Sequence, residues 1–210
     1  MEDSTTASKE FRFKCLRCGT CCTDKNTLVN LTYSDILRIR DGLNLTLEEV
    51  IDILGFYVYD KELTDEDRKR MVISPMITEK GLAFVGLRKD KMGSCYFYDN
   101  NHKRCKIYDL RPNFCRTFPF EFRIFIDKID KTKAKIRMDY TKKGNEYCPG
   151  IREDMSIINY DEWIKIGVKT LEGLNNNSII IEKWNKAAKS GGITPNVKNF
   201  LLNILKLKIS

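Results

Sequence analysis

The chain has 210 residues, of which 42% are hydrophobic and 31% charged, and its formal net charge at pH 7 is +8. This composition fits one domain with a hydrophobic core, or one domain with a helical appendage. A membrane-spanning protein is excluded because no apolar run approaches the roughly 18 residues that a membrane helix needs, and the polar residues 1–10 predict a flexible tail rather than a secretory signal.

Two capping boxes predict a pair of short helices near the start of the chain. Thr32 can cap a helix whose third residue is Asp35, and Gly42 is suited to end it. Thr46 and Glu49 form the pattern Thr-x-x-Glu ahead of a second apolar run. The sequence therefore predicts one helix that ends at Gly42 and another that begins after Thr46.

The middle of the chain contains two pairs of segments rich in β-forming residues. Residues 71–77 and 82–87 are separated by a short polar turn, and residues 120–126 and 134–140 alternate apolar with polar side chains around a charged loop. Each pair predicts an antiparallel hairpin. The charged stretch 60–70, which precedes both, is expected to be exposed and helical.

The rest of the chain is predicted to be helical. Residues 160–174 and 178–189 carry helical apolar patterns, and a final helix is expected to open with Thr194 as its cap and Pro195 at its first position. Trp184 is expected to lie in the core.

The predicted fold class is α+β. It consists of a small cysteine-cluster body, built of short antiparallel hairpins and helices, and a helical C-terminal third. The predicted boundaries are a flexible tail at residues 1–10, a cysteine-cluster metal-binding domain at 11–150 and a helical extension at 151–210 that packs on it.

All eight cysteines lie before the helical third, and four of them fall within eight residues. Without a secretory signal the chain is expected in the cytoplasm, a reducing compartment where clustered cysteines bind metal or react and seldom form disulfides. We therefore predict that the cysteines ligate a metal or cofactor as a set: Cys15, Cys18, Cys21, Cys22, Cys95, Cys105, Cys115 and Cys148.

The spacing of the first cysteines favours an iron–sulfur centre. Two intervening residues let a tight turn direct both sulfurs at one centre, and Cys15, Cys18 and Cys21 repeat the opening of the bacterial iron–sulfur run. In that run a later cysteine is followed by proline, as Cys148 is here, and Gly19 suits the turn because it tolerates a positive φ. Zinc is the alternative, since eight thiolates would also fill two tetrahedral zinc sites.

Two four-ligand centres are the expected arrangement, most simply two [4Fe-4S] clusters. Because neighbouring side chains in an extended segment point in opposite directions, Cys21 and Cys22 are assigned to different centres. The first hypothetical centre takes Cys15, Cys18, Cys21 and Cys148, and the second takes Cys22, Cys95, Cys105 and Cys115. With a core charge of about +2 for each centre, the site carries roughly −8 + 4 = −4, and the net charge of +8 falls to about +4.

Two arginines flank Cys115 in the sequence. Arg111 and Arg116 are predicted to offset the charge of a thiolate centre; they could equally bind an anionic substrate or form a structural ion pair. Pro112 is expected to open a short helix that Pro119 ends. The aromatic residues around the later cysteines are expected either to exclude water from the centre or to form ordinary core: Tyr96, Phe97, Phe114 and Phe118.

Together these motifs resemble the YkgJ-type cysteine-cluster family, a zinc- or iron-chelating domain known for its CxxCxxCC motif. The resemblance spans residues 11–150 and rests on residues 15–22, 105–112 and 115–119 and on the late Cys148. It implies a cysteine-ligated zinc or iron centre and names no reaction. The flagellin lysine N-methylases look like distant relatives, which favours iron–sulfur, but no glycine-rich nucleotide loop supports a methyltransferase here.

Three functions stay open on the sequence alone. The first is a protein with one or two centres for redox, electron-transfer or cluster-handling work, with an unidentified protein or redox partner. The second is an iron–sulfur enzyme that acts on an anionic or protein substrate, and the third is a zinc-stabilised domain whose basic helices bind RNA or protein. No membrane partner and no catalytic residue is predicted, since the only histidine, His102, is expected in an exposed loop.

Overall fold

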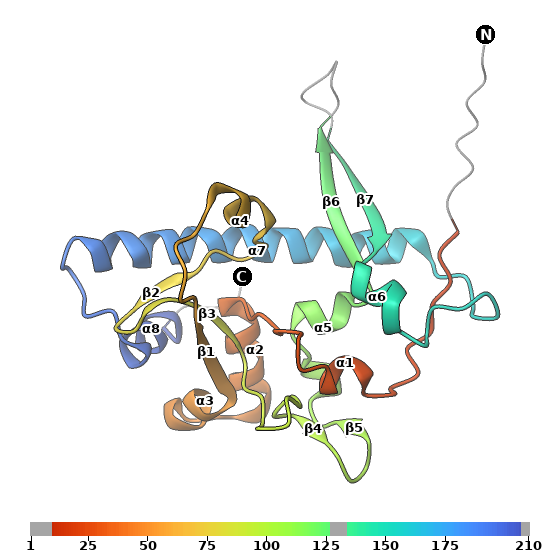
Figure 1. Ribbon diagram of the computed structural model, residues 1–210, viewed down its shortest axis with the longest axis horizontal. Coiled ribbons are helices and arrows are strands. Elements are labelled where there is room, and N and C mark those ends of the chain that lie inside the picture. The colour runs from red at the N-terminus through yellow and green to blue at the C-terminus, as the bar shows by residue number, and fades with distance from the viewer. Residues whose placement is uncertain (1–9, 127–133, 207–210) are drawn as a thin grey trace.

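The computed structural model describes residues 10–126 and 134–206, and these form short helices and small antiparallel sheets along one long helix (Figure 1). Residues 1–9 of the predicted tail and the loop at 127–133 lie outside the described residues. The elements up to residue 99 are α1 (Thr20–Thr23), α2 (Tyr33–Leu43), α3 (Leu47–Ile53), β1 (Leu54–Val58), α4 (Asp65–Arg70), β2 (Met76–Thr78), β3 (Gly81–Leu87) and β4 (Tyr98–Asp99). The later ones are β5 (Arg104–Cys105), the 3-10 helix η1 (Tyr108–Leu110), α5 (Asn113–Thr117), β6 (Phe120–Ile126), β7 (Ala134–Tyr140), α6 (Lys142–Tyr147), α7 (Tyr160–Lys189) and α8 (Val197–Ile204). The predicted α+β class is confirmed.

Both predicted capping boxes are present at the starts of α2 and α3. The Thr32 side chain accepts a hydrogen bond from the Asp35 amide at 3.2 Å, and the Asp35 carboxylate accepts one from the Thr32 amide at 3.0 Å. Thr46 and Glu49 cap α3 in the same way. The local sequence therefore determines where these helices begin.

The ends of the two helices differ from the prediction. The predicted stop at Gly42 is wrong, because α2 continues past it and Asn44 ends the helix in the left-handed conformation with φ 52°, which asparagine tolerates. After α3 the chain turns directly into β1 at Leu54, whose apolar side chain looks like one more helical residue in the sequence. The charged stretch at 60–70 is helical only over α4.

Both predicted hairpins are present. β2 is shorter than predicted and pairs with β3, which also pairs with β1 to give a three-stranded sheet of order β1-β3-β2. β6 and β7 have the predicted bounds and pair antiparallel, with Phe120 opposite Tyr140 and Ile126 opposite Ala134. A further short pair, β4–β5, lies in the cysteine-bearing middle segment.

One continuous helix replaces the two that were predicted for residues 160–189. α7 runs for 30 residues, because no proline interrupts it and the buried Asn177 side chain accepts a hydrogen bond from the Tyr33 amide at 2.9 Å. Trp184 is buried as predicted, and its indole N–H donates to the Ile77 carbonyl at 2.9 Å. The helix therefore anchors itself to α2 and β2 through polar as well as apolar contacts.

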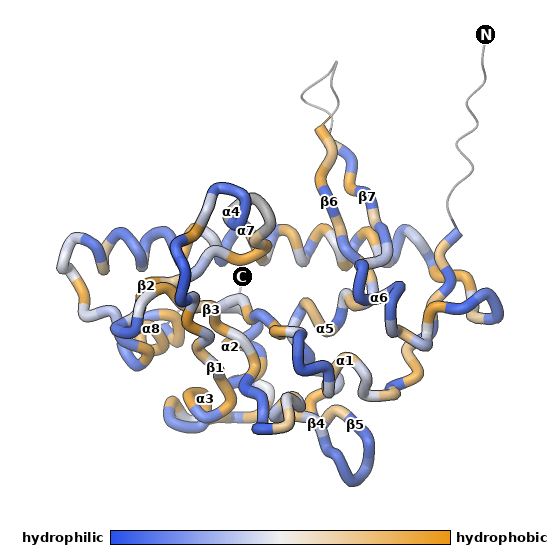
Figure 2. The backbone as a smooth tube through the Cα atoms, in the orientation of Figure 1, coloured by the Kyte–Doolittle hydropathy of each residue, from blue (hydrophilic) through white to orange (hydrophobic). Residues whose placement is uncertain are grey.

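The final helix begins later than predicted. Asn196, rather than Thr194, caps α8, so Pro195 precedes the helix instead of opening it. The buried Phe200 and Leu201 on α8 join a large core cluster with residues of α2, α3, α7 and the three-stranded sheet. The helical third thus shares its core with the body, and Figure 2 shows hydrophobic residues along the backbone of both parts. The domain boundary at residue 150 stays a prediction.

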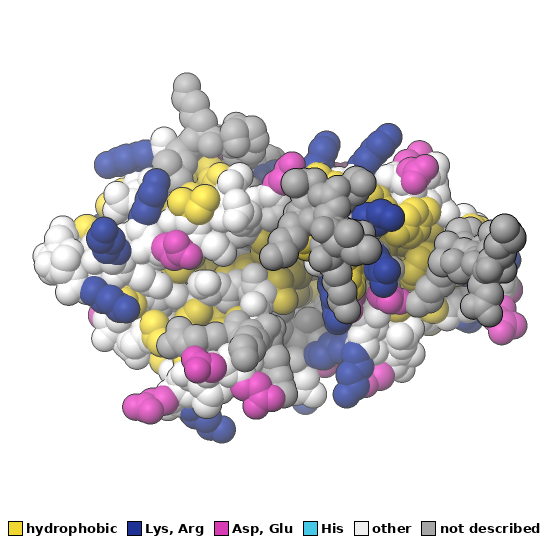
Figure 3. All heavy atoms as spheres, turned by 90° about the horizontal axis from the view of Figure 1, so that it is seen from above, with side chains coloured by type: hydrophobic (Ala, Val, Ile, Leu, Met, Phe, Trp, Pro, Cys, Tyr) yellow, Lys and Arg dark blue, Asp and Glu magenta, His cyan; other side chains and the backbone are white. Residues whose placement is uncertain are grey.

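The hairpin β6–β7 projects from the body beside α7 (Figure 1). Its base packs in a second, smaller core, and Phe122 lies so close to Gly167 of α7 that a Cβ there would clash. Cationic and anionic side chains are both spread over the face seen from above (Figure 3). None of the helices in the described ranges is long and apolar enough to cross a bilayer.

Candidate metal centre

All eight predicted ligands line a single cavity of about 480 Å³. They come from the segment before α1, α1 itself, the loop after β3, β5, α5 and the residue that follows α6. Cys15 and Cys148, which stand far apart in the sequence, line the same space. The fold therefore gathers the cysteines in one place, while their role as ligands stays a prediction.

The cysteine run is shaped by two residues with positive φ. Arg17 has φ 53° and Gly19 has φ 80°, and together they turn the chain into α1. This is the turn predicted at Gly19, where glycine is required because a Cβ would clash with the Tyr98 hydroxyl. The Cys22 amide then donates to the Gly19 carbonyl at 2.8 Å and starts the helix.

Cys21 and Cys22 lie on the one-turn helix α1 and not in an extended segment. The argument that assigned them to different centres because they point in opposite directions is therefore wrong, since adjacent helical residues are about 100° apart. A side-chain hydrogen bond in which Cys22 donates to Cys21 is the first cause of two opposite effects: it lowers the pKa of Cys21 to about 7 and raises the pKa of Cys22.

Backbone hydrogen bonds attach the later cysteines to this run. The Cys95 amide donates to the Cys22 carbonyl at 2.8 Å, and the Tyr98 amide donates to the Cys95 carbonyl at 2.8 Å. Tyr98 in turn is the partner of Cys105 across β4 and β5. This series of contacts fixes Cys22, Cys95 and Cys105 relative to one another.

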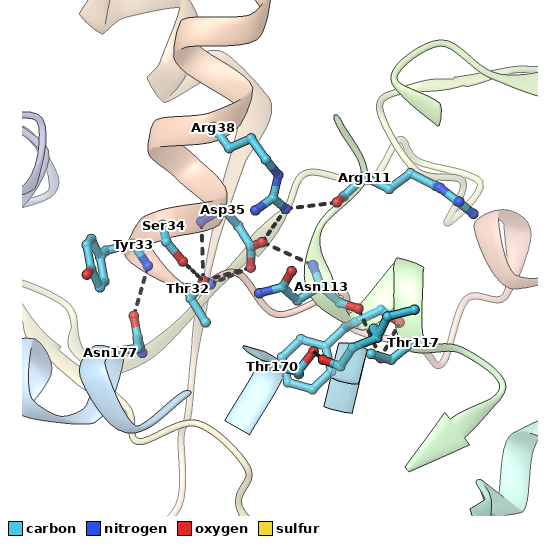
Figure 4. A network of polar contacts seen from close by, with 12 residues as sticks. Thr32, Tyr33, Ser34, Asp35, Arg38, Arg111, Asn113, Thr117, Thr170 and Asn177 are labelled. Atoms are coloured by element: carbon cyan, nitrogen blue, oxygen red, sulfur yellow. Dashed lines mark hydrogen bonds and ion pairs between the residues drawn. The ribbon is translucent and has the colours of Figure 1, made fainter. Parts of the chain in front are cut away.

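A buried carboxylate positions α5, the helix that carries Cys115 (Figure 4). Asp35 of α2 is fully buried and accepts hydrogen bonds from the Asn113 amide at 3.0 Å and from Arg38 Nη2 at 2.6 Å. Arg38 also donates to the Arg111 carbonyl at 2.9 Å. The side chain that caps α2 thus also holds the start of α5, a role that the capping pattern does not reveal.

Cys148 reaches the run through the residues that follow it. The Lys14 amide donates to the Gly150 carbonyl at 3.1 Å, and a Cβ at Gly150 would clash with the Lys14 carbonyl. Glycine is therefore required for this close approach. The segment after Cys148 lies directly beside the residue that precedes Cys15.

A polar cluster ties α6 to the loop after α1; we call it the Asp24 brace, and it consists of Asp24, Thr27, Lys89, Lys143 and Tyr147. Lys143 Nζ donates to Asp24 Oδ2 at 2.9 Å, and the hydroxyls of Thr27 and Tyr147 donate to the same carboxylate. Lys89 Nζ donates to the Asp24 carbonyl. The Thr27 hydrogen bond, followed by that of Lys143, holds the pKa of the Asp24 carboxyl well below its usual range. Sequence reasoning missed this brace because 119 residues separate its ion pair.

The eight sulfurs range from exposed to buried. Three of the cysteines are exposed: Cys15, Cys18 and Cys21. Cys95 is buried, and burial raises the pKa of its thiol to about 11. Burial is also the first cause of the raised pKa of three other thiols: Cys105, Cys115 and Cys148. At neutral pH these thiols keep their protons until a metal cation displaces them.

The charges of several thiols raise the pKa of others in the cavity. After burial, the thiols that raise the pKa of Cys148 belong to the run: Cys18, Cys21 and Cys15. Those that raise the pKa of Cys115 are Cys95, Cys21 and Cys105. The run therefore acts on Cys148, Cys95 and Cys105 act on Cys115, and Cys21 acts on both.

Arg111 lies among the thiols, and Arg116 lies at the exposed edge of the cavity. The charge of Arg111 acts to lower the pKa of Cys21, although the Cys22 hydrogen bond is the larger cause. Its guanidinium stacks on the Tyr108 ring at 3.6 Å from the centroid, and Nε donates to the Tyr108 carbonyl at 2.7 Å. Arg17, which sequence reasoning missed, stacks on the same ring at 4.2 Å. Tyr108 thus joins the cysteine run to the segment that precedes α5.

Tyr96 and His102 lie outside the wall of the cysteine cavity. Tyr96 is exposed and is not part of the cavity wall, so neither of its expected places, beside the centre or in the core, is right. The other three aromatic residues line the cavity as expected: Phe97, Phe114 and Phe118. His102 is exposed as predicted, and its Nδ1 shares a hydrogen bond with Asp99 at 2.9 Å.

The donor set fits a cysteine-ligated centre. Soft thiolate sulfur is a ligand for zinc and for iron–sulfur clusters alike. A single zinc ion holds its thiolates at about 2.3 Å, and here the eight cysteines form part of the wall of a cavity of about 480 Å³. Within the described parts of the chain, no three His, Cys, Asp or Glu side chains are grouped closely enough to hold one metal ion. The cysteines thus line the cavity without converging on one ion position.

Comparison with known proteins gives the family. A family model named CxxCxxCC, with the description "Putative zinc- or iron-chelating domain", matches residues 14–149, more than half of the chain. The chain belongs to the CxxCxxCC family. All eight cysteines of this CxxCxxCC protein fall inside the matched range, and the resemblance predicted from the motifs is confirmed.

The CxxCxxCC chain also matches an uncharacterised protein of Methanocaldococcus jannaschii. The two are 26% identical over 177 residues, which cover 84% of this chain and 78% of that protein. No solved structure matches the chain. Membership of the family supports metal binding in general, and the kind of metal and the reaction are matters for a proposal.

Proposed function

We propose that this CxxCxxCC protein holds two iron–sulfur centres, most simply two [4Fe-4S] clusters, for redox, electron-transfer or cluster-handling work in a reducing compartment. The observation that carries the proposal is that all eight thiols line one cavity of about 480 Å³. Such clusters supply one-electron redox chemistry, with a potential that burial and nearby charge adjust.

The proposed ligand sets keep the predicted division, on a different physical basis. One set is Cys15, Cys18, Cys21 and Cys148, and the other is Cys22, Cys95, Cys105 and Cys115. The first is supported by the Lys14–Gly150 contact, which brings the segment after Cys148 to the run. The second is supported by the backbone contacts that join Cys22 to the later cysteines.

The charge and exposure of the cavity suit a redox role. Two four-thiolate centres with core charges of about +2 would together carry roughly −4, and the Arg111 guanidinium lies close enough to act on the thiols. The exposed Cys15, Cys18 and Cys21 would place one edge of a centre at the surface. That exposure favours electron exchange with a protein partner over a purely structural site.

The deciding measurement is the content of iron, zinc and acid-labile sulfide per chain in anaerobically prepared protein. Two [4Fe-4S] clusters give about eight iron and eight sulfide, with visible absorbance that bleaches when dithionite is added. About two zinc per chain with no sulfide would replace the proposal with the zinc-stabilised domain. The family description names both metals, so zinc is the second candidate.

A further inference from the structure

One end of the cysteine cavity has a wall that contributes no thiol. It is formed by the base of the hairpin and the first turns of α7, where Phe120 and Trp163 meet with ring centroids 4.6 Å apart. Phe13 packs edge-on against Trp163 at 5.9 Å. Ile166, also on α7, lines the cavity and is 36% exposed. This end of the cavity is therefore apolar, as small-molecule sites commonly are, and of its residues Ile166 is the most exposed while Phe120 is buried.

Apart from the cysteines, the ionisable side chains with the strongest charge on the cavity wall are all arginines. Three arginines line it, and no aspartate, glutamate or lysine among the described residues does: Arg17, Arg111 and Arg116. The first two stack on Tyr108 and so have a place beside the thiols. Arg116 has no such ring, is exposed, and forms no ion pair with a described carboxylate. Its guanidinium fork is available to an anion that enters the cavity.

We propose that the aromatic end of the cavity binds a small organic anion, with Arg116 on its carboxylate or phosphate group and Trp163 against its apolar body. A guanidinium binds either oxyanion through paired charge-assisted hydrogen bonds. An aromatic wall contributes contact area for the rest of the molecule. The inference deepens the proposed function, because the ligand would lie beside the thiols that hold the proposed centres.

Isothermal titration calorimetry on the anaerobically prepared protein tests the ligand class with three probes of similar size. Phenyl phosphate and phenylacetate carry the two candidate anionic groups, and 2-phenylethanol is their uncharged counterpart. We expect at least one anion to bind about tenfold or more tightly than the alcohol, since a charged hydrogen bond is worth about 1.5–3 kcal/mol. The stronger of the two anions identifies the headgroup.

Three variants locate the site. Arg116→Gln should weaken the anion about tenfold or more and leave the alcohol unchanged. Trp163→Leu should weaken all three probes, because it removes the shared apolar contact. Arg123→Gln is the matched control, since Arg123 lies on the exposed hairpin, pairs with Glu121 and does not line the cavity.

Iron, zinc and sulfide are measured on each preparation, so the two proposals fail separately. A zinc protein that still binds an anion through Arg116 would contradict the iron–sulfur centres and support this site. If the iron-replete Arg116→Gln variant binds the anion as tightly as the parent does, the proposed site is refuted. It is also refuted if the parent binds the anion and the alcohol with equal affinity. The site is also refuted if none of the probes binds when its concentration reaches about 10 mM. A binding free energy of about 4 kcal/mol corresponds to a Kd of about 1 mM and would be detected there.

Discussion

One glycine, Gly19, helps to fix the shape of the cysteine run. Gly19 has φ 80° and faces the Tyr98 hydroxyl, so both its backbone conformation and its lack of a Cβ are required. The sequence predicted the first property, because glycine between closely spaced cysteines is typical of such a turn. It did not predict the second, because Tyr98 belongs to a strand far along the chain.

Gly19→Ala should therefore cost more than backbone strain alone. Gly191 is a matched control: its φ is 73°, and a Cβ there would meet nothing within 4 Å. Each alanine should lower the free energy of unfolding by about 1–2 kcal/mol through the left-handed conformation, measured by urea denaturation. Only Gly19→Ala should also reduce the metal bound per chain, because it displaces the run from Tyr98. Equal metal content in both variants would show that the close contact has no part in holding the site.

The division of the cysteines into two sets is testable one residue at a time. If the proposed sets are right, Cys22→Ser and Cys148→Ser each remove one centre, and each variant keeps about half of the parent's metal. The double variant should retain almost none. Metal and sulfide analysis measures this directly, and a single variant that loses everything would mean that the centres share ligands or are interdependent.

At the scale of helices and strands, features that depend on local patterns were predicted from the sequence, and features that depend on long-range contacts were not. The capping boxes of α2 and α3 and the alternation in β6 and β7 lie within a few residues, so the sequence predicted them. The continuity of α7 was missed because Asn177, which resembles a loop residue, is satisfied by the distant Tyr33. The same limit hid the second role of Asp35 in holding α5.

The Asp24 brace predicts a large difference between two adjacent lysines of α6. Lys143 reaches Asp24 at 2.9 Å, whereas the neighbouring Lys142 is 91% exposed and contacts Glu146 only at 3.8 Å. Lys143→Met should lower the free energy of unfolding by about 1–3 kcal/mol, because it leaves a hydrogen-bonded carboxylate without its cation. Lys142→Met should change it by less than about 0.5 kcal/mol.

Metal content adds a second readout for these variants. Because α6 leads into Cys148, Lys143→Met should also speed the loss of metal to a chelator, and Lys143→Arg should restore part of the parent's retention. Identical loss rates in Lys142→Met and Lys143→Met would show that the brace stabilises the fold without positioning Cys148.

At the scale of the whole molecule, the sequence predicted which cysteines lie together but not the geometry of the cavity that they line. The cysteines are recognisable by their number and spacing, and they line one cavity. The aromatic end of that cavity was not predicted, because its main residues come from the hairpin base and α7, two elements that carry no cysteine and lie apart in the sequence. A cluster of cysteines can thus be recognised from composition and spacing, whereas a cavity wall depends on how distant elements pack.

Burial of the thiols predicts how metal affinity depends on pH. Burial raises the pKa of Cys95 to about 11 and also raises the pKa of Cys105, Cys115 and Cys148, so these thiols are protonated in the metal-free protein at neutral pH. Ligation replaces each proton with metal, so protons compete with the metal and affinity must fall as the pH falls. Each displaced proton changes the apparent affinity about tenfold per pH unit.

Competition with a chromophoric chelator measures this dependence for Zn²⁺ and the metal-free protein between about pH 6 and pH 8. We expect the logarithm of the affinity to rise by about two or more per pH unit across this window, because several thiols titrate above it. Serine at Cys95 should reduce the slope, since one proton fewer is displaced. A slope near zero in the parent would mean that the buried thiols are already thiolates, and the charge compensation would then have to come from the protein itself.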